Sequence, residues 1–102
     1  MVKQVLQVSV RFFTVLREIT GKKEDTLTFS EDETATVSAA LKKLASRYGR
    51  SFVEYVYSGE AGEVKGFLQF LVNGRSVSSF EELDTKLKDG DVLAIIPPIG
   101  GG

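Results

Sequence analysis

One stretch of this chain has the apolar spacing of a long amphipathic helix. Apolar residues recur at i, i+3, i+4, i+7, i+8 and i+11 from Val37 to Tyr48, which is one stripe of a helix with 3.6 residues per turn. Thr36 before the stripe is a suitable N-cap, and Gly49 after it is a suitable helix stop. A single amphipathic helix must bury its apolar face against another element, and a sheet is the element that the flanking segments can supply. The pattern therefore predicts an α+β fold.

The segments on both sides of this helix have the signals of strands and turns. Alternation or short apolar runs predict strands over residues 5–12, 26–29, 67–72 and 92–96. A polar link over residues 21–25 is expected to join the first two strands, and Asn73-Gly74 predicts a tight hairpin into a further short strand. The interpretation is a mixed sheet of about five strands, the first and last central, with one main helix packed on one face.

Three apolar side chains have the phase that points away from the helix. Phe13 breaks the alternation of the first strand, and Leu71 and Ile96 lie on the outward phase of theirs. Clustered apolar groups on an uncovered sheet face indicate a docking surface, the alternative being the scattered hydrophobic residues that any surface carries. The cations of the helix region, Lys42, Lys43, Arg47 and Arg50, are interpreted as a solvated face.

Several kinds of function are excluded by what the chain lacks. It has no cysteine and no histidine, which removes thiolate nucleophiles, Ser-His-Asp triads and the usual zinc sites. Thirteen Lys and Arg residues against fourteen Asp and Glu residues give a net charge of −1, which does not suit a phosphate-driven nucleic-acid binder. With no apolar run of membrane-spanning or signal-peptide type, we expect a cytoplasmic protein that does not use a membrane.

The last six residues differ in composition from the rest. They read Pro97, Pro98, Ile99, Gly100, Gly101 and Gly102, and predict a flexible tail over residues 97–102 behind a domain over residues 1–96. A terminal carboxylate is anionic and a poor electrophile, so another protein would have to activate it. Glycines lack a Cβ and could enter a narrow channel. The alternative is an inert, frayed chain end.

Five stretches resemble ubiquitin-like β-grasp sulfur carriers of the MoaD/ThiS family. The likeness is nearest to its MoaD branch, the small subunits of molybdopterin synthase, and extends to archaeal small ubiquitin-like modifiers. The stretches are residues 12–21, the helix start Thr36-Val37, and residues 71–74, 87–92 and 94–102. This resemblance implies a ubiquitin-like β-grasp fold.

The resemblance also implies a function centred on Gly102. An activating enzyme similar to MoeB would use ATP to adenylate the Gly102 carboxylate, and a sulfur donor would convert it to a thiocarboxylate. The tail would then enter a MoaE-like large subunit and supply sulfur for molybdopterin, the organic part of the molybdenum cofactor. Phe13, Arg17, Leu71 and Ile96 would contact partners, although Arg17 could also be a plain solvated charge.

Two other functions stay open. The same tail could form isopeptide bonds with target lysines, as in archaeal modifiers, or the domain could be an interaction module with an inert tail. In each case the chain is expected to bind no metal or cofactor itself and to be a carrier rather than an enzyme.

Overall fold

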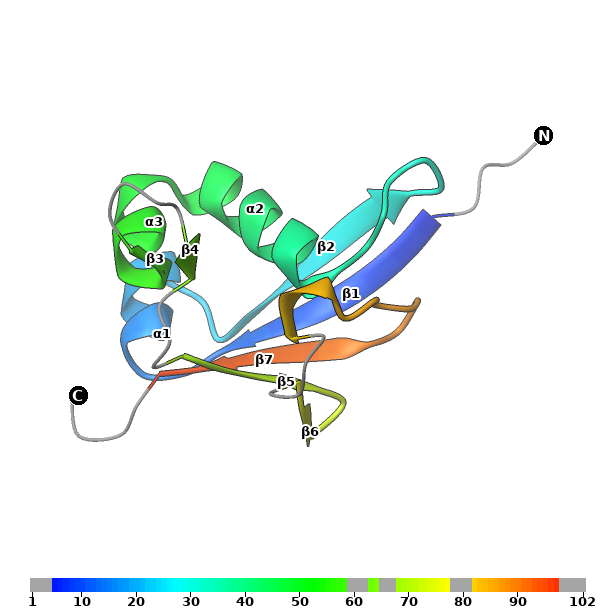
Figure 1. Ribbon diagram of the computed structural model, residues 1–102. Helices are drawn as coiled ribbons and strands as arrows, with labels where there is room; N and C mark the ends of the chain where they lie inside the picture. Colours follow the sequence, from blue (N-terminus) through cyan, green and yellow to red (C-terminus); the bar gives the residue numbers. More distant parts are fainter. Residues whose placement is uncertain (1–4, 59–62, 65–67, 78–81, 98–102) are drawn as a thin grey trace.

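The computed structural model describes residues 5–58, 63–64, 68–77 and 82–97 of the chain (Figure 1). Its main helices are α1 (Val15–Thr20), α2 (Val37–Tyr48) and α3 (Arg50–Val56), and a 3-10 turn, η1, covers Glu82–Asp84. The strands are β1 (Val5–Phe12), β2 (Glu24–Ser30), β3 (Tyr57–Ser58), β4 (Glu63–Val64), β5 (Gln69–Val72), β6 (Arg75–Ser76) and β7 (Val92–Ile96).

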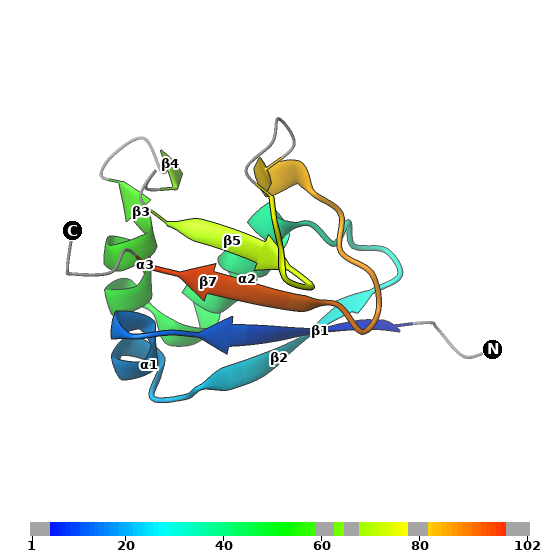
Figure 2. The ribbon, with the colours of Figure 1, turned by 90° about the horizontal axis from the view of Figure 1, so that it is seen from below.

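The principal sheet has five strands in the order β2-β1-β7-β5-β6. β1 and β7 run parallel, with Val10 opposite Leu93, and the other neighbours are antiparallel. Figure 2 shows β1 and β7 side by side between β2 and β5. The mixed sheet with its first and last strands in central positions is therefore confirmed.

The core lies between this sheet and α2, which crosses one of its faces (Figure 1). Helix α2 begins where the sequence predicts, because the Thr36 hydroxyl accepts a hydrogen bond of 3.1 Å from the Ala39 amide. The alternating residues of the central strands and the stripe of α2 meet there with no exposed surface: Val8, Val10, Phe12, Val37, Ala40, Leu41, Leu44, Leu93 and Ile95. One main helix on one face of a mixed sheet is the α+β architecture that the sequence pattern predicts, and it agrees with the ubiquitin-like β-grasp fold that the resemblance implies.

The connection between β1 and β2 differs from the polar link expected from the sequence. Helix α1 occupies most of it, and Glu24 and Asp25 belong to β2. Gly21 ends α1 with a positive φ of 73°, and its amide donates to the Arg17 carbonyl at 2.8 Å. A helix of six residues with one fully buried side chain, Leu16, is too short to produce the repeating stripe by which helices are identified in a sequence.

A polar cluster ties the start of β2 to the end of α2. The Tyr48 hydroxyl donates to the Asp25 carboxylate, and Arg47 donates both to this carboxylate at 2.8 Å and to the Thr26 carbonyl at 3.1 Å. Burial acts to raise the pKa of Asp25, but the hydrogen bonds from Tyr48 and Arg47 outweigh it and lower the pKa. Burial, and then the hydrogen bond to Asp25, raise the pKa of Tyr48 to about 12. The expectation that Arg47 and Lys43 are merely solvated is wrong, since Lys43 also pairs with Glu33 at 2.8 Å.

The raised pKa of Tyr48 predicts how stability depends on pH in alkaline solution. Folding favours the protonated phenol, so this contribution is complete below pH 10 and is lost as the pH rises from 10 toward about 12. Tyr48→Phe is expected to lower the free energy of unfolding at neutral pH by about 1 kcal/mol, through loss of the hydrogen bond to Asp25. Its stability should then fall less steeply than that of the wild type above pH 10. Urea unfolding at several pH values measures both effects, and parallel curves above pH 10 would contradict the assignment.

Candidate functional site

The face of the sheet opposite α2 has an apolar area formed by β5, β7 and the end of β1. In Figure 2 this face is turned toward the viewer, with α2 behind the sheet. Leu71 on β5 and Arg11 on β1 both lie opposite Ala94, and Gln69 lies opposite Ile96. We call the half-buried apolar residues of this area the outer sheet face: Phe13, Leu71, Val92, Ala94 and Ile96.

Phe13 directly follows the last residue of β1, at the edge of this area. The parallel pairing of β1 with β7 ends with Phe12 opposite Ile95, and Phe13 and Ile96 are the residues that directly follow these two. Thr14 then takes a positive φ of 51°, which turns the chain into α1. Phe13, Leu71 and Ile96, which the sequence selects by their outward phase, are all half-buried and lie outside the buried core.

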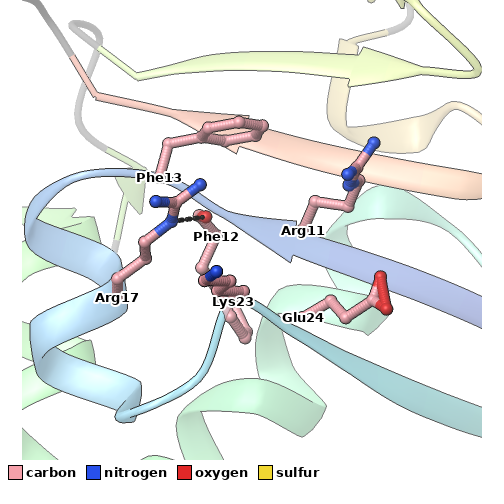
Figure 3. Close-up of a pocket in the computed structure, with 6 residues that line it drawn as sticks. All are labelled: Arg11, Phe12, Phe13, Arg17, Lys23 and Glu24. Carbon is pink, nitrogen blue, oxygen red and sulfur yellow. Dashed lines mark hydrogen bonds between the residues drawn. The ribbon is translucent and has the colours of Figure 1, made fainter.

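Arg17 is attached to the same corner of the sheet. Its Nε donates to the Phe12 carbonyl at 3.0 Å, and its guanidinium carbon lies 5.6 Å from the centre of the Phe13 ring (Figure 3). A guanidinium group over an aromatic face is attracted by the ring and limits its movement. Arg17 is exposed and makes two contacts at this corner, one with the Phe12 carbonyl and one with the Phe13 ring.

The hairpin after β5 fixes the register of the outer sheet face. Asn73 and Gly74 have positive φ values of 53° and 83°, as a tight type I′ turn requires. The Asn73 side chain accepts from the Val92 amide and donates to Asp91, each at 2.9 Å. The turn that the sequence predicts therefore also attaches to the start of β7. The single Asn of the chain has the left-handed conformation of the turn and makes both of these side-chain hydrogen bonds.

The segment that follows β7 starts beside this face. β7 ends at Ile96, at the end of the molecule where α1 and α3 lie (Figures 1 and 2). Pro97 is buried against the folded body. The remaining residues predicted to form the tail, Pro98, Ile99, Gly100, Gly101 and Gly102, lie outside the described residues.

The described residues offer little for metal or membrane chemistry. No group of three or more acidic, histidine or cysteine residues among them could hold a metal ion. None of the helices in the described ranges is long and apolar enough to cross a membrane. The feature that stands out is the outer sheet face leading to the chain end.

Comparison with known proteins agrees with this arrangement. The ThiS family model matches residues 10–102. Small archaeal modifier protein 3 of Haloferax volcanii is 34% identical over 97 residues, which is 95% of this chain and 100% of that protein. A Pyrococcus furiosus structure with a provisional assignment as molybdopterin converting factor subunit 1 is 29% identical, with a TM-score of 0.70 over 92% of this chain and 99% of that one. A chain of the BexX/CysO complex of Amycolatopsis orientalis is 30% identical, with a TM-score of 0.71 over 93% of this chain and 99% of that one.

The β-grasp fold and these relatives together place the chain in the class of ubiquitin-like sulfur carriers and protein modifiers. The chain belongs to the ThiS family within this class.

Proposed function

We propose that this chain is a sulfur carrier that acts through the carboxylate of Gly102 and supplies sulfur for molybdopterin biosynthesis. An ATP-dependent, MoeB-like enzyme would join the carboxylate to AMP and release pyrophosphate. Hydrosulfide released by a sulfur donor would then attack the acyl carbon and displace AMP, which leaves a thiocarboxylate and a proton. All the ATP chemistry would belong to the partner, in the cytoplasm, and this chain would contribute the reacting group and the domain by which it is held.

The observation that carries this proposal is the position of the outer sheet face next to the end of β7. A partner bound to Phe13, Leu71 and Ile96 would lie beside Ile96, the last residue of β7, from which the chain continues toward Gly102. Binding at this face would therefore direct the terminus to the partner's reaction site, and correct placement is a large part of catalysis. A MoaE-like large subunit would use the same face when it accepts the sulfur.

A second function, covalent modification of target lysines, is favoured by one comparison. The Haloferax relative that matches along its whole length is named a modifier protein. A thiocarboxylate or acyl-adenylate at Gly102 could react with a lysine amine as well as with a sulfur acceptor, so both functions share their first step. They differ in the product that accumulates on the chain and on other proteins.

Mass spectrometry of the protein from its own cells tests the two functions. A sulfur carrier is expected to show the mass increase of one oxygen replaced by sulfur at the terminus, with no conjugates. A modifier is expected to leave its C-terminal tryptic fragment, residues 89–102 after Lys88, joined through Gly102 to lysines of other proteins. If neither product is found in cells that make the molybdenum cofactor, the proposal is contradicted. That result would favour an interaction module with an inert tail.

A further inference from the structure

A hollow beside the outer sheet face gathers three cations at the corner between β1, α1 and β2. Its floor and rim, shown in Figure 3, are formed by Arg11, Phe12, Phe13, Arg17, Lys23 and Glu24. The cations come from three elements that the fold brings together: Arg11 from β1, Arg17 from α1, and Lys23 from the residue before β2. Phe13 contributes the adjoining apolar wall.

The charges of this hollow are not balanced inside the described part of the chain. Ion pairs there join Lys22 and Arg47 to Asp25, Lys43 to Glu33, and Arg50 to Glu54. Arg11, Arg17 and Lys23 take part in none of them, although Arg11 lies opposite Glu24 across the β1–β2 pair. Glu24 is the one acidic residue of the hollow, so three positive groups face one negative group in a chain whose net charge is −1.

The hydrogen bonds of the described residues leave the charged groups of these three cations available to a partner. Arg17 uses its Nε for the Phe12 carbonyl, and no contact with another described residue occupies its two terminal nitrogens. The Phe12 amide donates to the Lys23 carbonyl at 2.8 Å, which holds the start of β2 against the end of β1. Backbone hydrogen bonds therefore hold the strands around the hollow together, and cationic side chains lie at its rim.

We propose that this hollow binds an acidic segment of the partner that docks on the outer sheet face, with the carboxylates held by Arg11, Arg17 and Lys23 and an adjacent apolar side chain packed on Phe13. An excess of positive charge without internal partners is complementary to carboxylates and would also steer the encounter. The planar guanidinium groups suit the two oxygens of a carboxylate. This inference deepens the proposed docking function and rests on it, and it adds the chemistry by which a partner is selected.

A peptide titration followed by NMR tests the hollow directly. The probes are a blocked peptide of sequence Glu-Leu-Asp-Phe-Glu and its uncharged counterpart Gln-Leu-Asn-Phe-Gln, each added to the full chain at low salt. The acidic peptide is expected to bind with a dissociation constant of about 1 mM. It should shift the amide signals of Arg11, Phe13, Arg17 and Lys23. The double variant Arg11→Gln with Lys23→Gln should weaken binding by about tenfold, since two exposed charge contacts are lost.

The matched control is the double variant Lys42→Gln with Arg50→Gln, which removes two exposed cations on α2 and α3. This variant should bind the acidic peptide as tightly as the wild type does. Equal binding of both peptides, shifts confined to other residues, or no shifts would overturn the inference. So would inorganic phosphate that reproduces the same shifts at the same concentration, since it would indicate a simple anion site. The titration does not involve Gly102, so its result is independent of the adenylation test. The peptide can fail to bind while Gly102 is adenylated, or bind while Gly102 is not adenylated.

Discussion

Removal of Gly101 and Gly102 is expected to abolish ATP–pyrophosphate exchange by the cognate activating enzyme. The proposed reacting group is the carboxylate of Gly102, and a chain that ends earlier would present its carboxylate short of the reaction site. Gly101→Val keeps the length but adds a β-branched side chain that restricts the backbone and obstructs a channel shaped for glycine. A displacement of about 1 Å can cost ~100-fold in rate, so this variant should lose activity by at least that factor.

Folding provides the control for both tail variants. The last buried residue that the structure describes is Pro97, so neither change alters a described buried residue. The free energy of unfolding should therefore stay within about 0.5 kcal/mol of the wild type in urea titrations. Exchange that persists after removal of the two glycines, or that is absent with the full chain and its cognate enzyme, would contradict the carrier function.

A carboxylate placed on the outer sheet face is expected to weaken partner binding by about 100-fold while the fold survives. The few hot-spot residues at the centre of an interface cost about 2 kcal/mol or more when they are truncated. If Phe13 and Ile96 have this role, Ile96→Asp or Phe13→Asp would lose such a contact and bury an unpaired charge. Both side chains are half-buried and lie outside the buried core, so the domain should keep its circular dichroism spectrum. Isothermal titration calorimetry with the activating enzyme measures the loss.

Val5→Asp is the matched control for this prediction. Val5 has the same outward phase on β1 and is 53% exposed, but it lies eight residues from Phe13, about 26 Å along an extended strand. It should bind as the wild type does. If Val5→Asp weakened binding as much as Ile96→Asp, the effect would come from charge in general and not from contact at the proposed face.

Most of the candidate site could be predicted from the sequence because its apolar part follows strand phase. Phe13, Leu71 and Ile96 point away from α2 as alternation requires, and the Asn73-Gly74 turn has the backbone that this pair favours. The sequence did not indicate that Arg11 and Lys23 belong to the same corner. Neither residue has a local signal, since a charged residue on an outward phase is typical of any exposed strand.

Local periodicity determined which side chains are buried, because alternation in strands and the stripe of α2 specify a face without reference to the rest of the chain. The residue type at position 36 determined where α2 begins, because the Thr36 hydroxyl caps the helix. Only the tertiary structure decided which elements are neighbours. The parallel pairing of β1 with β7 places Arg11 opposite Ala94, and α1 brings Arg17 over Phe13. Such contacts depend on the closure of long chain segments around a shared core, and no short pattern in the sequence records that closure.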